Sequence, residues 1–237
     1  MKKDDLLFGI IGLLLGFIVG YLLTTSYNQR SVLPAPVAAA GNAAPNTGGA
    51  PPDANEAPVP DAQIISAAQQ RAQAESSNFD VQMQTGDVLY RARRYADAAG
   101  YFIKANELQP KAIEPMIALG NVYYDEARDN NANDKWPLSE KWYLAALLLE
   151  PKNINVRTDL GLTYVLRQPP VYDRAIKEFK QALAENPKHE PALQNLVVAY
   201  TQQNNTAEAK ATLAQLEKIN PQNTSLPDLR QSVSQLK

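Results

Sequence analysis

Side chains that could bind a cation gather in one short stretch of the sequence. Asp129, Asn131 and Asn133, followed by Glu140, have the spacing of the oxygen ligands in a twelve-residue calcium loop. Carboxylate and amide oxygens are also the ligand types that calcium prefers. However, Asp134 occupies the position at which such a loop turns on a glycine. The pattern therefore favours a polar turn without a metal, and a metal-dependent module is the alternative interpretation.

Few other residues could carry out catalysis. The single histidine, His189, stands beside Glu190 in an expected surface turn, and cysteine is absent. The absence of cysteine excludes disulfides, thiol catalysis and cysteine-ligated metal centres. The sequence contains neither a phosphate-binding glycine loop nor a nucleophile motif. We therefore predict a protein that is not an enzyme and has no catalytic residue, metal ligand or cofactor.

The charges of the chain nearly balance, with 23 Lys and Arg residues against 25 Asp and Glu residues. A nucleic-acid-binding domain needs an excess of positive charge on one face. The sequence therefore predicts no nucleic acid as a partner.

The stretch from residue 79 to residue 223 repeats one pattern of small and bulky side chains. The pattern is aligned on four prolines that follow helical runs, Pro110, Pro151, Pro187 and Pro221. Eight residues before them stand the bulky side chains of Phe102, Tyr143, Phe179 and Leu213, and five before stand Ala105, Ala146, Ala182 and Leu216. Upstream of the first three blocks lie Gly86, Gly120 and Gly161. Antiparallel helices cross closely where small residues meet, so each block predicts a helix pair in which these glycines face the alanines.

This pattern resembles the tetratricopeptide repeat. The resemblance implies an all-α fold, a right-handed α-solenoid of four helix-turn-helix units at 79–112, 113–153, 154–189 and 190–223, within a repeat domain at 79–225. The first two units start 34 residues apart, which is one repeat period, and the second is seven residues longer. We call residues 125–135, where this excess falls, the insertion. Capping helices are expected at 61–78 and at 226–237, because a solenoid exposes apolar faces at both ends.

The resemblance also implies that the first helix of each unit lines a concave groove that binds a protein segment. Counting positions within each unit places thirteen residues on this groove, facing out of the packing. They are Met83, Asp87, Tyr90, Arg91, Ile117, Asn121, Tyr124, Asp125, Thr158, Leu162, Val165, Gln194 and Val198. Two alternatives stay open: the apolar positions of the third unit pack on neighbouring helices, or the insertion binds the partner through Trp136.

The first sixty residues do not have the composition of a globular domain. Leu6–Leu23 contains no charge and would span about 27 Å as a helix, close to the ~30 Å of a bilayer core. Lys2 and Lys3 precede it, so residues 1–25 are expected to form a cytoplasmic N-terminus and one transmembrane helix. A cleavable signal peptide is the alternative. Residues 26–60 are rich in Pro, Ala and Gly and predict a disordered linker.

The predicted membrane helix also carries Gly12, Gly16 and Gly20 in two overlapping G-x-x-x-G motifs. Glycines at this spacing form a groove in which a second helix can approach closely. Self-association through this helix is therefore one expected interaction.

Together these features predict a single-pass protein of the bacterial cytoplasmic membrane, with the repeat domain on the outer, periplasmic side. Its expected function is that of a scaffold or assembly adaptor for unidentified envelope proteins. The plan is similar to membrane-tethered repeat proteins of the envelope, including the repeat modules of cytochrome c maturation factors. An accessory role in cytochrome c maturation is thus one alternative function, and an enzymatic or metal-dependent module at the insertion is another.

Overall fold

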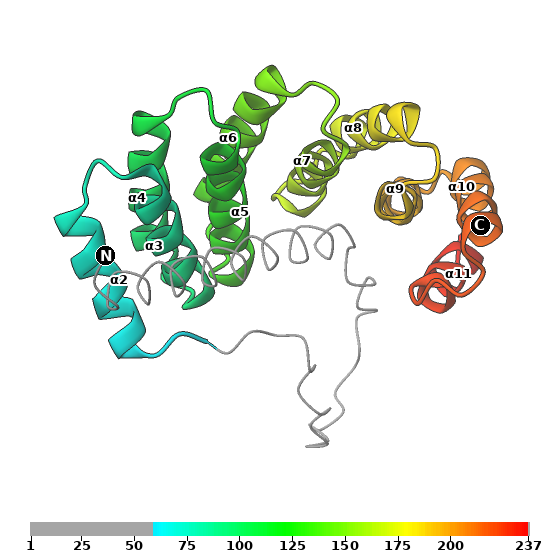
Figure 1. Ribbon diagram of the computed structural model, residues 1–237. Coiled ribbons are helices and arrows are strands. Elements are labelled where there is room, and N and C mark those ends of the chain that lie inside the picture. Colours follow the sequence, from blue (N-terminus) through cyan, green and yellow to red (C-terminus); the bar gives the residue numbers. More distant parts are fainter. Residues whose placement is uncertain (1–58, 237) are drawn as a thin grey trace, which may run out of the picture.

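The computed structural model describes residues 59–236. These residues form helices and no strand, and the helices follow an arc (Figure 1). The helices are α2 (Ala62–Ala74), α3 (Phe79–Arg91), α4 (Tyr95–Leu108), α5 (Glu114–Asp129), the 3₁₀ helix η1 (Asn133–Lys135), α6 (Trp136–Leu149), α7 (Ile154–Leu166), α8 (Tyr172–Glu185), α9 (Glu190–Gln202), α10 (Thr206–Ile219) and α11 (Leu226–Ser234). The prediction of an all-α solenoid is confirmed.

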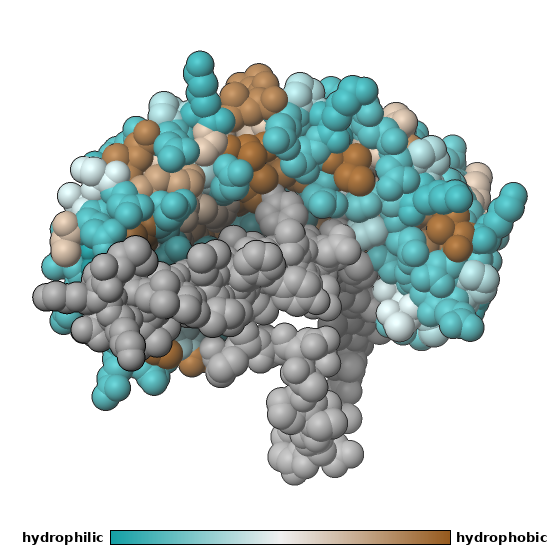
Figure 2. All heavy atoms as spheres, viewed as in Figure 1, coloured by the Kyte–Doolittle hydropathy of each residue, from teal (hydrophilic) through white to brown (hydrophobic). Residues whose placement is uncertain are grey.

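Consecutive helices pack as pairs, α3 with α4, α5 with α6, α7 with α8 and α9 with α10. The first helices α5, α7 and α9 lie on the inner side of the arc, and their partners lie on the outer side (Figure 1). Hydrophilic residues cover most of the surface in this view, with hydrophobic patches between them (Figure 2). The arrangement therefore gives the domain a concave face made of first helices.

Within residues 59–236, no helix is both long enough and apolar enough to cross a bilayer. The predicted membrane segment Leu6–Leu23, with Gly12, Gly16 and Gly20, lies outside the described residues, as does nearly all of the predicted linker. These features stay predictions.

The glycines lie at the helix crossings, but they face aromatic rings rather than the predicted alanines. A Cβ atom added to Gly120 would lie 2.4 Å from Cε1 of Tyr143, and one added to Gly161 would lie 2.3 Å from Cε1 of Phe179. Gly86 has the same relation to Phe102, at 2.5 Å. These three rings are almost completely buried, so each glycine makes room for a buried aromatic ring of its own unit.

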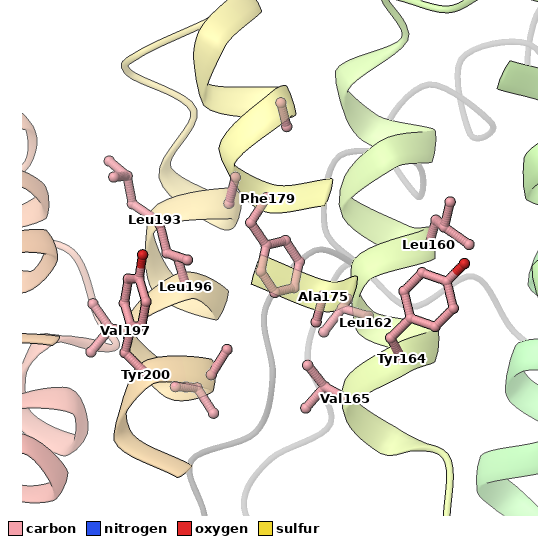
Figure 3. Packing of buried hydrophobic residues seen from close by; sticks show 14 of the residues in the cluster. Leu160, Leu162, Tyr164, Val165, Ala175, Phe179, Leu193, Leu196, Val197 and Tyr200 are labelled. Carbon is pink, nitrogen blue, oxygen red and sulfur yellow. The ribbon is translucent and has the colours of Figure 1, made fainter. Parts of the chain in front are cut away.

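The third and fourth units share one hydrophobic core, which also includes part of the second unit. Phe179 lies between the buried side chains of α7, including Leu162 and Val165, and those of α9, including Val197 and Tyr200 (Figure 3). The same cluster extends to Leu226, Leu229 and Val233 of α11. The final helix therefore covers apolar surface that the fourth unit would otherwise expose.

At the other end of the domain, α2 packs on α3 through polar groups as well as apolar ones. The Gln82 amide donates to the carbonyl oxygens of Ala72 (3.1 Å) and Glu75 (3.3 Å). The Thr85 hydroxyl lies 3.2 Å from the carbonyl oxygen of Ala68 and 2.8 Å from that of Val81 in its own helix. The two bonds from Gln82 satisfy carbonyls at and just after the C-terminal end of α2, which have no partner within that helix.

The insertion is tied to two units rather than projecting into solvent. The Asn133 amide nitrogen donates to the Gln168 carbonyl (2.7 Å), and its oxygen accepts from the Gln168 N–H (3.0 Å). Trp136, just after the insertion, is 5% exposed and packs edge-on against Tyr124, with 5.5 Å between ring centroids. The alternative in which an exposed Trp136 binds the partner is therefore wrong.

Candidate functional site: the concave face

The structure divides the thirteen predicted groove residues into two groups. Six are wholly or partly exposed, and all six belong to α3 or α5: Met83, Asp87, Tyr90, Arg91, Asn121 and Tyr124. We call these six residues the groove site. The other seven are buried: Ile117, Asp125, Thr158, Leu162, Val165, Gln194 and Val198. The expectation that these seven side chains face out of the packing is wrong.

The buried group has a physical explanation in the packing of α7 and α9. Leu162, Val165 and Val198 belong to the shared hydrophobic core, because α7 and α9 carry apolar residues on a second face. The Thr158 hydroxyl donates to the Ile154 carbonyl of its own helix, at 2.8 Å. The Gln194 amide donates to the Asn223 side chain at 2.7 Å, between α10 and α11. Packing on neighbouring helices, the alternative left open for the third unit, is what the structure shows.

Two polar residues of the groove site, Tyr90 and Asn121, are held by neighbouring helices. The Tyr90 hydroxyl donates to Asp125 of α5, which also pairs with Arg128 at 3.0 Å. The Asn121 oxygen accepts from the Tyr143 hydroxyl at 2.7 Å. Because these bonds cross between helices, the side chains have fixed positions before any partner binds.

A second polar cluster joins the first two units beside the groove site. Asp129 at the end of α5 accepts from the Tyr95 hydroxyl (2.5 Å) and pairs with Arg93 (3.2 Å) and Arg128 (2.9 Å). Burial would raise the pKa of Asp129, but the bonds from Tyr95 and Arg128 outweigh it and lower that pKa. Asp129 is therefore a structural anion that links α4 to α5.

The proposed calcium ligands bond to protein groups instead of facing one another. Asp129 is held as described, and Asn133 binds the Gln168 backbone. Glu140 accepts from the Tyr164 hydroxyl at 3.0 Å and pairs with Arg174 at 3.1 Å. Residues 59–236 contain no group of three or more His, Cys, Asp or Glu side chains that could hold a metal ion. The calcium-like spacing thus marks a turn that joins two units.

His189 also differs from its expected place. It precedes the first residue of α9 and is buried, whereas the sequence suggested a surface turn. Burial lowers the pKa of this imidazole, which favours its neutral form. Among the described residues, the buried Nε2 atom of His189 has no hydrogen-bond partner, and His189 lies outside the groove site.

Asp87 is the carboxylate of the groove site, and its pKa is strongly shifted. Burial raises its pKa to about 7, and nearby Arg91 offsets only part of this effect. The raised pKa means that the fold favours protonated Asp87. Ionisation of Asp87 therefore lowers the free energy of unfolding progressively as the pH rises from about 4, the pKa of this carboxyl in the unfolded chain, to about 7, its pKa in the folded chain.

We expect Asp87→Asn to remove this dependence. At pH 8 the variant should be more stable than the natural chain by about 1 kcal/mol, since the partly exposed carboxylate keeps some solvent screening. At pH 4 the two should have the same melting temperature. Asp134→Asn, which alters an exposed carboxylate, is the control and should leave the pH profile unchanged. Parallel profiles for Asp87→Asn and the natural chain would contradict the prediction.

Comparison with known proteins assigns the architecture. A family model for the tetratricopeptide repeat matches residues 172–232, which are α8 to most of α11. The chain contains tetratricopeptide repeats. No curated protein matches its sequence.

Solved structures extend this tetratricopeptide repeat fold beyond the matched residues. A thermophilic repeat protein, TTC0263 from Thermus thermophilus, is 16% identical and has a TM-score of 0.54, covering 72% of this chain and 87% of its own. MamA from Desulfovibrio magneticus is 17% identical with a TM-score of 0.55, covering 68% and 87%. A tetratricopeptide repeat protein from Parabacteroides merdae is 19% identical with a TM-score of 0.59, covering 72% and 63%. At these identities the likeness concerns the fold alone.

Proposed function

We propose that this protein is a membrane-tethered scaffold that binds a segment of a partner protein at the groove site. One observation carries the proposal: Tyr90 of α3 and Asn121 of α5 are held by hydrogen bonds to other helices, and the bond from Tyr90 to Asp125 joins α3 directly to α5. Fixed side chains lose little conformational entropy when a partner binds. A surface arranged in this way is suited to recognition rather than to chemistry.

The residue types of the groove site describe the partner. Tyr124 and Met83 offer apolar area, and Asp87 offers a poorly solvated carboxylate whose desolvation nearby Arg91 offsets only in part. Asp80 and Glu114, at the starts of the same two helices, are exposed and add negative charge. The partner segment is therefore expected to carry apolar anchors together with lysine or arginine, and to bind with modest affinity.

Position-specific photo-cross-linking in native membranes tests this function. A photoreactive amino acid at Met83 or Arg91 of the full chain should capture one recurring partner protein. The same amino acid at Lys177, on the outer helix α8, should not capture it. Equal capture from Lys177, or no capture from either groove position, would contradict the proposal.

The location of the domain is a separate part of the proposal. The charge-free Leu6–Leu23 segment, preceded by Lys2 and Lys3, supports a single span with the repeat domain outside the cytoplasm. A reporter enzyme that works only outside the cytoplasm should therefore be active when fused after Lys237. A stable, full-length and inactive fusion would reverse the orientation. Release of the domain from washed membranes would show instead that the segment is cleaved.

A further inference from the structure

The outer side of the first two units exposes an unusual amount of apolar surface. We call Ile103 of α4 and Leu144, Leu148 and Leu149 of α6 the outer apolar patch; their exposed fractions are 37%, 43%, 83% and 43%. Ile103 and Leu144 each stand seven residues before the turn proline of their unit, so they occupy equivalent positions on neighbouring helices. Figure 2 shows hydrophobic atoms at the upper edge of the domain, where α6 ends in Figure 1.

This patch has no function in the fold. Outer helices of a solenoid need only one apolar face, and α8 has charged residues at the positions that face solvent. In α6, by contrast, apolar residues continue around the helix, and Leu144 and Leu148 form a stripe one turn apart. Contiguous exposed apolar surface rimmed by polar residues marks an interaction site.

The charges around the patch carry both signs in a particular order. On α4, Lys104 stands six residues and Glu107 three residues before the turn proline. On α8, by contrast, Lys180 lies over the Tyr200 ring of α9, at 5.6 Å, and Glu185 pairs with Lys152 at 3.2 Å. The order that concerns the patch is therefore that of α4, in which the lysine lies nearer the middle of the helix and the glutamate lies nearer its end.

Such an order is self-complementary across a two-fold axis. When α6 packs antiparallel to its copy, Leu144 lies opposite Leu148 of the partner subunit. The same rotation places Lys104 within about one residue, ~1.5 Å of helix rise, of Glu107 of the partner subunit. Lys104 and Glu107 already pair within the chain at 3.3 Å, so across the axis they form a network of four charges.

We propose that the outer apolar patch binds the same patch of a second copy of this chain, with the two α6 helices antiparallel. The mixed charges of α4 distinguish this occupant from an anionic bilayer, which would repel Glu107. The contact leaves the concave face open, so it is independent of partner binding at the groove site. It is also separate from any contact between membrane helices.

Cysteine cross-linking tests the contact directly, since the natural chain contains no cysteine. Full-length Leu144→Cys and Leu148→Cys proteins are mixed in lipid nanodiscs large enough for two copies and oxidised. The mixture should form a covalent dimer faster than either variant alone. Ala214→Cys, at the exposed position of α10 equivalent to Leu144, is the control for random collision. A rate no higher than that of Ala214→Cys would overturn the proposal.

A charge exchange tests the antiparallel arrangement itself. Glu107→Lys in the same cysteine proteins places lysines opposite one another twice, so the cross-linking rate should fall by about tenfold. Adding Lys104→Glu restores the opposite order and should restore the rate. A rate that is insensitive to both changes, or that the second change fails to restore, would overturn this arrangement. Because these sites lie on the outer side, the photo-capture from Met83 and Arg91 should stay unchanged throughout.

Discussion

Replacing Gly120 by leucine is expected to lower the free energy of unfolding by about 3 kcal/mol, at the upper end of the usual cost of overpacking. The reason is geometric: even a Cβ atom at Gly120 would lie 2.4 Å from the Tyr143 ring. Tyr143 is buried and also donates to Asn121, so its ring cannot turn aside without losing that bond. Chemical denaturation of the full chain in detergent, followed by circular dichroism, measures the change.

Gly100→Ala is the matched control for this substitution. Gly100 also lies within a helix, but a Cβ atom added there meets no atom within 4 Å. Alanine should therefore stabilise α4 by up to about 1 kcal/mol through its higher helix propensity. The opposite signs of the two changes separate crowding at the crossing from the general effect of losing a glycine. Equal effects would show that the Gly120–Tyr143 contact is misplaced.

Removing an aromatic ring that faces one of the crossing glycines should lower the free energy of unfolding even more than Gly120→Leu does. Phe179→Ala is expected to cost about 4 kcal/mol, because Phe179 is fully buried between α7 and α9. The ring occupies the space left by Gly161, and neither helix can close that space without moving the fourth unit. The same denaturation experiment gives the change in free energy.

Tyr101→Ala provides the comparison for Phe179→Ala. Tyr101 is also an aromatic residue of an outer helix, but it is only partly buried against the smaller core cluster of the first two units. Its removal should cost less than half as much, because less apolar area returns to water. A larger loss for Tyr101→Ala would place the main core in the first two units instead.

The sequence was sufficient to predict the helix pairs because each pair depends on local spacing. Gly86, Gly120 and Gly161 recur with a bulky residue eight positions before a proline, and that period is independent of distant contacts. The side chain that each glycine contacts on the opposite helix was harder to predict from the sequence. The alignment placed glycine against alanine, whereas the structure places it against the aromatic ring, because direction across a crossing depends on side-chain rotamers.

The groove site could be predicted only for the first two units. In α3 and α5 the polar residues at groove positions are at least partly exposed, except Asp125, which is buried. In α7 and α9, Leu162, Val165 and Val198 occupy the same positions, and their residue types fit either an apolar groove or a second packed face. Periodicity cannot distinguish these outcomes, since both place apolar residues on the same stripe. The bond between Asn133 and Gln168 had no sequence signal, because it joins a short 3₁₀ helix to the loop after α7.

The contacts between each glycine and its ring have a consequence for how the chain folds. Phe102 contacts Gly86, and Phe179 contacts Gly161, across one short turn. The contact between glycine and ring therefore closes only a small loop of chain. Loops of this size close at low entropic cost, and proteins dominated by such contacts fold rapidly. Each unit can therefore begin to form as soon as its second helix has emerged during synthesis, before the rest of the arc exists. Only the part of the hydrophobic core that α7, α9 and α11 build together cannot form until the C-terminal residues have been synthesised.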